Sequence, residues 1–208
     1  MRMMPSIQLV TCLVLLQSAP RAKTAQAFHW EWRDAQELFA AQSLRNARIS
    51  ESAKHAIGKA IEEQLRPNMT DLEIHSEGEL WRAALDTRVK MTDLNGDAVP
   101  EVIAHAMADC SPTGNCSVWV FQKTPAGYKL LLSGFGQTFT IQRTSRAGFK
   151  DIVIAMHDSA FDSMITVYRY QHGAYGDIAC YDAEFSVMGR GGNMQDLKEP
   201  RITPCGSK

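Results

Sequence analysis

Val118-Trp-Val-Phe-Gln-Lys-Thr-Pro-Ala-Gly-Tyr128 is the stretch that decides the fold, because a similar stretch follows it along the chain. Ile165-Thr-Val-Tyr-Arg-Tyr-Gln-His-Gly-Ala-Tyr175 aligns on it without gaps, at an offset of 165 − 118 = 47 residues. Each stretch joins a run of β-branched and aromatic residues to a turn cluster, which predicts a β-hairpin. A period of about 50 residues has the size of a propeller blade, and two such units form either one larger sheet or two packed sheets. The alternative is a chance likeness between two ordinary hairpins.

Alternating sequence around these hairpins extends the predicted sheet. From Leu85 onward the period is two, with Thr87, Val89 and Met91 alternating with polar or charged neighbours. Short links between successive runs favour an antiparallel meander of about seven or eight strands. The later strands are expected at Val102–Ala106, Val118–Gln122, Tyr128–Leu132, Phe139–Arg143, Ile152–His157, Ile165–Tyr170 and Asp177–Tyr181.

Helical periodicity precedes the strands. Residues 31–66 predict two helices, separated by a break at 46–50. Ser50 is the expected N-cap of the second helix, and Pro67 ends that helix. The segment 79–84 stays open between a helical turn and the start of a strand. Two N-terminal helices followed by strands define the α+β class. The predicted regions are a helical part at 28–84 and an antiparallel β domain at 85–208.

The first 27 residues carry the three-part pattern of a secretory signal peptide. Arg2 gives a positive start, the run Ile7–Leu16 is mostly apolar, and Ala25-Gln26-Ala27 places small residues at a cleavage site. The apolar run is shorter than the roughly 20 residues that span a bilayer, and no later stretch qualifies. We therefore expect a signal peptide at 1–27, no membrane span in the mature chain, and a secreted or periplasmic protein. A buried N-terminal helix is the alternative.

The cysteines agree with export. Four of the five remain after residue 27, and an even number in an exported chain predicts two disulfides. Of the three pairings, the sequence favours Cys110–Cys116, which closes a loop of turn-forming residues, and Cys180–Cys205, which ties the C-terminal tail to the last strand. A metal site at the cysteines is disfavoured, because no Cys-x-x-Cys pair occurs.

Composition and charge limit the classes of function. The chain has 208 residues, 45% hydrophobic and 22% charged, which fits one globular domain. The formal net charge is -1, and 22 − 3 = 19 basic residues stand against 23 acidic residues after residue 27. This balance excludes a dedicated nucleic-acid binder, which needs a basic excess to neutralise phosphates.

One loop carries a chemical motif, Asp93-Leu-Asn-Gly-Asp-Ala-Val-Pro-Glu101. Oxygen donors at its positions 1, 3, 5 and 9 predict a calcium (Ca2+) site, because calcium binds six to eight hard oxygens. Alternatively, Asn95-Gly96 is the preferred central pair of a type I′ hairpin turn, in which the acids are merely solvated. The expected ligands are the side chains of Asp93, Asn95, Asp97 and Glu101 and the carbonyl group of Val99.

The loop and the strand after it, residues 89–106, resemble the calcium loops of FG-GAP or VCBS-type repeats. The resemblance implies that the five residues of the preceding paragraph bind Ca2+. One departure is Ala98, which stands where those loops usually carry glycine. A degenerate second copy at 143–156 keeps a single acid, Asp151. The other ligand positions of that copy hold Arg143, Ser145 and Ala147.

The sequence patterns that indicate a catalytic site are weaker than the pattern that indicates the calcium loop. His157-Asp158-Ser159 contains the residue types of a hydrolase triad, but adjacent residues on a strand point in opposite directions. His157 and His105 hold similar places in the two repeats, and with Asp158 or Asp109 they are candidates for zinc or acid–base chemistry. No Gly-x-Ser-x-Gly nucleophile elbow occurs.

Together these patterns predict a secreted or periplasmic, non-enzymatic binding module, stabilised by calcium, with a protein or glycan partner. An exposed aromatic stripe on the strands would indicate such a partner. Two alternatives stay open. One is a small secreted hydrolase that uses His157, Asp158 or His105. The other is an inhibitor of an envelope-active enzyme, whose Cys110–Cys116 loop enters the cleft of its partner.

Overall fold

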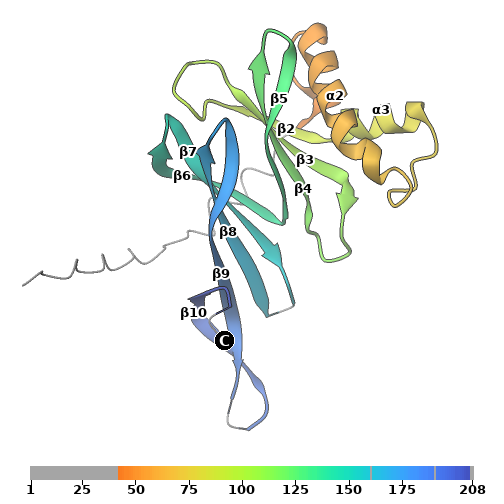
Figure 1. Ribbon diagram of the computed structural model, residues 1–208. Helices are drawn as coiled ribbons and strands as arrows, with labels where there is room; N and C mark the ends of the chain where they lie inside the picture. Colours follow the sequence, from red (N-terminus) through yellow and green to blue (C-terminus); the bar gives the residue numbers. More distant parts are fainter. Residues whose placement is uncertain (1–41, 160, 190, 207–208) are drawn as a thin grey trace, which may run out of the picture. The chain divides into compact units, whose positions relative to one another are not determined.

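The computed structural model describes residues 42–159, 161–189 and 191–206. Within these ranges, ten strands form two five-stranded antiparallel sheets, and two α-helices accompany the first sheet (Figure 1). The first sheet has the strand order β1-β2-β3-β4-β5, and the second has the order β10-β9-β8-β7-β6. The elements are β1 (Gln42–Ser43), α2 (Glu51–Leu65), α3 (Glu77–Asp86), β2 (Arg88–Thr92), β3 (Glu101–Cys110), β4 (Cys116–Thr124), β5 (Gly127–Gly136), β6 (Thr138–Arg146), β7 (Phe149–His157), β8 (Asp162–Gln171), β9 (Ala174–Met188) and β10 (Met194–Pro204).

Each helix begins at a serine cap. The hydroxyl of Ser50 accepts a hydrogen bond from the backbone N–H of Ala53 at 3.2 Å, which starts α2 where the sequence predicts it. The hydroxyl of Ser76 accepts the N–H of Glu79 at 3.2 Å, and the carboxylate of Glu79 accepts the N–H of His75 at 2.7 Å. These two bonds fix the start of α3, so the segment that the sequence left open is helical.

The pair of helices differs from the expected pair. The second expected helix forms as α2, but the first one does not extend into the described residues. Gln42–Ser43 is a strand, and Leu44 donates its N–H to the carbonyl oxygen of Thr87 at 2.8 Å. The chain is therefore tied to the edge of the first sheet instead of continuing a helix. Residues 31–41 and the expected signal peptide at 1–27 lie outside the described residues.

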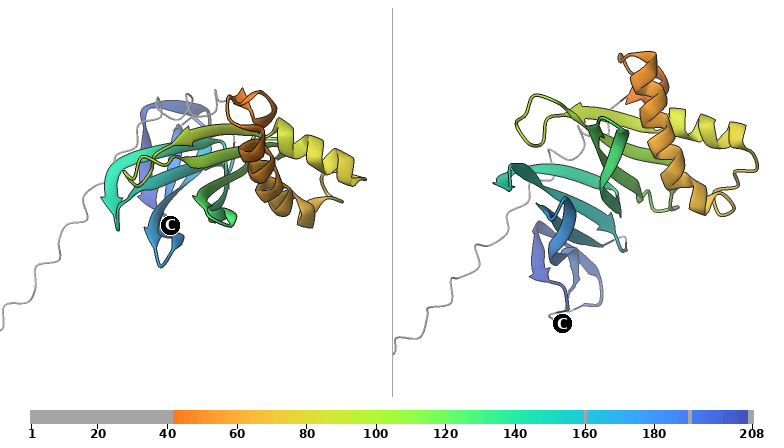
Figure 2. Two further views of the ribbon diagram at one scale, coloured as in Figure 1. Left: turned by 90° about the horizontal axis from the view of Figure 1, so that it is seen from above. Right: turned by 45° about the horizontal axis from the view of Figure 1, so that its top comes forward.

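Side chains of the first sheet alternate between two cores, because successive residues of a strand point to opposite faces. On β3, Val102 and Ala104 pack under the helices, whereas Ile103 faces the second sheet. On β4, Trp119 and Phe121 are buried under the helices, so these aromatic residues are core and not an exposed stripe. Figure 2 shows the helices on one side of the first sheet and the second sheet on the other.

The second core lies between the two sheets. Its members come from both sheets, and no strand of one sheet is paired with a strand of the other among the described residues. Burial of apolar side chains therefore joins the sheets, in place of a continuous ladder of backbone hydrogen bonds. The buried members are Leu94, Ile103, Val118, Val120, Leu131, Leu132, Phe139, Phe149, Ile152, Ile154 and Tyr175.

The expected antiparallel meander of about seven or eight strands is corrected to ten strands among the described residues, and of the two arrangements left open, one larger sheet or two packed sheets, the structure has two sheets. A single residue, Gln137, separates β5 from β6. A hairpin loop usually contains at least two residues, so the chain does not fold back there and instead leaves the first sheet for the second. The sequence also missed β10, because most of its side chains are polar and exposed and show no apolar alternation.

The two similar stretches of sequence form equivalent hairpins, one in each sheet. The first becomes β4–β5 and the second becomes β8–β9. The strand register shifts between Val120 and Phe121 in the first hairpin, and between Val167 and Tyr168 in the second. These positions correspond at the offset of 47 residues, so the hairpins share a backbone irregularity as well as a sequence pattern.

Two disulfides link segments of the β domain covalently. Cys110–Cys116 joins β3 to β4, with 3.9 Å between the Cα atoms, and Cys180–Cys205 joins β9 to the residue after β10, with a Cα separation of 5.4 Å. These are the pairings that the sequence favours. Disulfides persist in oxidising compartments, so both bonds fit an extracytoplasmic protein.

Candidate functional site

The acidic loop between β2 and β3 is coiled around the carboxylate of Asp93. This carboxylate accepts backbone N–H groups from Asn95 at 3.2 Å, Gly96 at 2.6 Å and Ala98 at 3.1 Å. These bonds, the one from Gly96 above all, hold the pKa of Asp93 below its ordinary value. The first predicted ligand is thus fixed as an ionised carboxylate.

The next two predicted ligands turn into the same loop. The side-chain amide of Asn95 donates to the carboxylate of Asp97 at 2.9 Å, and its oxygen accepts the N–H of Asp97 at 3.0 Å. Asp97 also accepts the N–H of Val99 at 2.7 Å. A carboxylate offers about four lone-pair sites, so these bonds leave acceptor capacity for a cation.

The loop is not a two-residue hairpin turn. A type I′ turn needs positive φ at both central residues, and Asn95 is not among the described residues with positive φ. Positive φ occurs at Gly96, with +80°, and at Ala98, with +64°. Ala98 therefore adopts the left-handed conformation that glycine adopts most easily, and the loop coils in spite of its Cβ atom.

Glu101 closes the loop from beneath. Its side chain is 1% exposed, and its carboxylate accepts the N–H of Leu94 at 2.9 Å. Burial raises the pKa of Glu101, and the nearby charges of Asp97 and Asp93 raise it further, while the bond from Leu94 lowers it. A divalent cation among these three carboxylates would offset both the burial and the repulsion.

Leu94 connects this loop to the second sheet. Its side chain is fully buried in the core between the sheets, and its carbonyl oxygen accepts the N–H of Lys150, on β7, at 2.9 Å. The predicted ligands Asp93 and Asn95 are its immediate neighbours in sequence. An ion bound in the loop would therefore act on the junction of the two sheets.

In the degenerate second copy of the loop, the one remaining acid is paired with a guanidinium group from β8. Asp151, which corresponds to Glu101, is 2% exposed. It accepts two hydrogen bonds from Arg169, at 3.0 and 2.7 Å, and one from the hydroxyl of Thr144 at 2.9 Å. Its buried charge is therefore balanced within the protein, whereas no basic side chain forms an ion pair with Glu101 among the described residues.

The donor set of the first loop fits calcium better than zinc or a redox metal. All the predicted ligands of the loop offer oxygen, the donor that calcium prefers. Within the described part of the chain, no group of three or more His, Cys, Asp or Glu side chains is already gathered as a metal-binding cluster. The ligands that would hold the ion are those predicted from the sequence: Asp93, Asn95, Asp97, the carbonyl group of Val99, and Glu101.

The disulfide loop at 110–116 is docked on the second sheet through Asn115. The side chain of Asn115 is buried, donates to the carbonyl oxygen of His157 at 2.8 Å and accepts the N–H of His157 at 2.8 Å. The side chain thus makes the two hydrogen bonds to His157 that the backbone of a paired strand would make. The exposed residues of this loop are Cys110 and the turn at residues 112–114.

The candidate histidines lie on different sheets. His105, on β3, is partly buried, and burial together with the charge of Arg88 lowers its pKa to about 4. His157 ends β7, and the following Asp158 is exposed. Neither of the two cavities described among the resolved side chains is lined by His105, His157 or Asp158.

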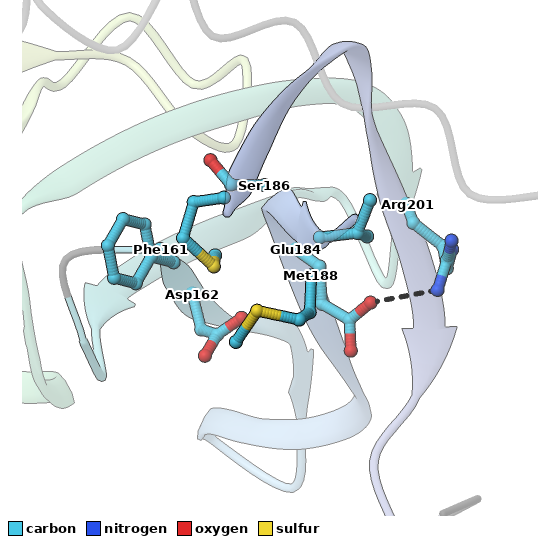
Figure 3. A pocket seen from close by; sticks show the side chains of 8 residues that line it. Phe161, Asp162, Glu184, Ser186, Met188 and Arg201 are labelled. Atoms are coloured by element: carbon cyan, nitrogen blue, oxygen red, sulfur yellow. Dashed lines mark hydrogen bonds and ion pairs between the residues drawn. The ribbon is translucent and has the colours of Figure 1, made fainter. Parts of the chain in front are cut away.

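A groove beside the β9–β10 hairpin has no counterpart in the sequence predictions (Figure 3). Its volume is about 580 Å³. We call it the hairpin groove. Its residues are far apart in sequence and come together only through strand pairing, so periodicity did not reveal it. The lining residues are Phe161, Asp162, Glu184, Ser186, Val187, Met188, Met194 and Arg201.

Comparison with known proteins finds no protein-family model that matches the chain, and neither a curated protein nor a solved structure that is significantly similar to it. Within the part of the chain that the structure describes, no helix combines the length and the apolar character needed to cross a membrane. The geometry of the loop and of the hairpin groove therefore carries the functional argument.

Proposed function

We propose that the protein is a secreted or periplasmic, non-enzymatic binding module in which one calcium ion in the loop 93–101 stabilises the junction of the two sheets. The observation that carries this proposal is the position of Leu94. Its neighbours are the oxygen donors of the loop, and its own backbone joins Glu101 on β3 to Lys150 on β7. An ion bound in the loop would therefore stabilise a segment that is hydrogen-bonded to both sheets.

The charges of the loop support calcium in particular. Asp93, Asp97 and Glu101 place three carboxylates on one loop, and burial of Glu101, together with the charges of Asp97 and Asp93, raises the pKa of Glu101. A divalent cation removes that repulsion and supplies the counter-charge that Arg169 provides to Asp151 in the second copy. Calcium concentrations outside cells suit even a weak site, and the two disulfides fit such a compartment.

Thermal unfolding of the oxidised protein in calcium and in chelator tests this proposal. A hundredfold excess of calcium over its Kd stabilises the folded state by about 2.7 kcal/mol. For a chain of this size, that free energy raises Tm by about 5–10 °C. Magnesium at the same concentration is the ion control, because its octahedral, hydrated preference suits this loop less well.

Asp97→Asn is the informative variant. It keeps an acceptor for the N–H of Val99, gives up the bond from the side-chain amide of Asn95 and removes one charge, so we expect a folded protein with a much smaller rise in Tm with calcium. Asp71→Asn makes the same change at an exposed position outside the loop and should retain the full rise. Equal calcium effects in both variants, or no rise in the unmodified protein, would overturn the calcium site.

A further inference from the structure

The hairpin groove gathers large apolar side chains that are open to water. Phe161, Met188 and Met194 are 43%, 68% and 40% exposed, and the two methionines are direct partners across the β9–β10 pair. Proteins seldom leave such side chains grouped at the surface unless the group binds something. Methionine is flexible and polarisable, so it packs against apolar partners of different shapes.

A row of charged residues crosses the same groove. Asp162 on β8, Glu184 on β9 and Arg201 on β10 are register partners, and the guanidinium of Arg201 lies 3.2 Å from the carboxylate of Glu184 (Figure 3). Two carboxylates directly opposite each other repel. A third, Asp196, accepts the hydroxyl of Ser186 at 2.7 Å. Among the described residues that line the groove, two carboxylates therefore stand against one guanidinium, with Asp196 near by.

We propose that the hairpin groove binds a polypeptide segment that presents an arginine or lysine beside an apolar side chain. This inference rests on the proposed function of a binding module and names its partner class. The cation of the ligand lies beside Asp162 and Glu184, whose two negative charges Arg201 balances only in part, while the apolar side chain packs on Met188 and Phe161. A volume of about 580 Å³ accommodates a few side chains and falls within the usual size of ligand sites.

The groove favours a polypeptide over other ligands with a positive charge. A metal ion or a small cation would leave the methionines and Phe161 without a role. A nucleic acid would meet the carboxylates with its phosphates and be repelled. A glycan recognised by stacking would need aromatic rings, and among the described residues Phe161 is the one ring that lines this groove.

Fixed-residue peptide libraries test the proposal. The full chain with its disulfides intact is immobilised and exposed to three hexapeptide libraries, each with one central residue fixed as arginine, glutamate or norleucine and the other positions mixed. Retained peptides are quantified by mass spectrometry. We expect the arginine library to be retained about tenfold over the glutamate library, with leucine, methionine or phenylalanine enriched beside the arginine.

Two sets of variants assign the binding to the groove. Asp162→Asn combined with Glu184→Gln should abolish the preference for arginine, whereas Glu199→Gln, a neutralised exposed acid on β10 that does not line the groove, should retain it. Met188→Ser should abolish the enrichment of apolar neighbours. Met107→Ser is its control, because Met107 is a 45% exposed methionine on β3. Unchanged circular dichroism establishes that each variant is folded.

Several results would overturn the proposal. These are equal retention of the three libraries, an arginine preference that survives the double variant, displacement of the peptides by neutral oligosaccharides, or a dimer that Met188→Ser dissociates. A rise in Tm with calcium but no peptide selectivity would overturn the groove assignment and leave the calcium site intact. Peptide selectivity without any effect of calcium would overturn the calcium site and leave the groove assignment intact.

Discussion

At the scale of single residues, Ala98 shows how the acidic loop differs from the loops it resembles. Its φ is +64°, and left-handed backbone costs a residue with a Cβ atom about 1–2 kcal/mol relative to its ordinary conformation. The bonds that Asp93 accepts, including the one from the N–H of Ala98, hold the backbone in this shape. The loop therefore coils at the expense of local strain.

Ala98→Gly should relieve this strain and stabilise the protein by about 1 kcal/mol, because glycine adopts positive φ freely. For a chain of this size the change raises Tm by about 2–4 °C. Differential scanning calorimetry of the oxidised protein measures it. Ala126→Gly is the control, since Ala126 lies in an exposed turn without positive φ and the added backbone freedom should lower Tm there. A lower Tm for Ala98→Gly would contradict the strain assigned to this position.

Sequence spacing was informative about the loop and uninformative about the groove. The donors Asp93, Asn95 and Asp97 stand two residues apart, so a short segment determines their convergence. Phe161 and Met188 meet only because β8, β9 and β10 pair in one particular register. That register depends on contacts over many residues, which a periodicity argument does not contain.

At the scale of secondary-structure elements, the disulfide loop is a connector between sheets. Asn115 occupies the place of a paired strand residue beside His157, with both of its bonds at 2.8 Å. Cys110–Cys116 closes the loop around Asn115 and limits the conformations of the unfolded loop. The inhibitor hypothesis leaves residues 112–114 and the exposed Cys110 of this loop for a partner, because Asn115 is already engaged.

Asn115→Ala should destabilise the protein by about 2 kcal/mol, because the variant leaves the N–H and the carbonyl group of His157 without these partners in a partly buried place. Urea unfolding measures the loss, and hydrogen exchange at the amide of His157 should become faster. Asn68→Ala makes the same change at an exposed position outside the loop and should cost less than about 0.5 kcal/mol. Similar losses in the two variants would contradict a role for Asn115 in docking the loop.

Elements with local signals were predictable, and elements defined by distant partners were not. Ser50 and Pro67 fix α2 within a short segment, so the sequence located that helix. The chain at Gln42–Ser43 has helical periodicity before it but pairs with β2, some 47 residues away (89 − 42), and tertiary contacts override the local preference there. β10 shows the same limitation, because its position depends on β9.

At the scale of the whole domain, acid should weaken the protein through a histidine. His105 lies on the face of β3 that also carries Ile103, toward the second sheet, and its pKa is lowered to about 4 by burial and by Arg88. A histidine with a lowered pKa binds fewer protons in the folded state than in the unfolded state. Stability is therefore lost as the pH falls from about 6.5 toward 4.

The loss amounts to at most about 3 kcal/mol over this range, at 1.36 kcal/mol for each pKa unit. His105→Gln keeps a polar side chain that does not titrate and should flatten the dependence of the unfolding free energy on pH between 6.5 and 4. His75→Gln, the same change at an exposed residue, is the control. Urea unfolding at a series of pH values measures both, and parallel pH curves for the two variants would refute the assignment to His105.

The link at Gln137 has a consequence for how the chain folds. Apart from the short strand β1, each strand pairs with its neighbour along the chain, and each sheet is complete within one uninterrupted stretch on either side of Gln137. Both disulfides also join partners close in sequence, at separations of 6 and 25 residues. Such a topology has low contact order, so the first sheet can assemble before the second on a chain that enters its compartment N-terminus first. The first sheet then serves as a template, and its exposed inter-sheet face is covered as soon as β6 and β7 follow.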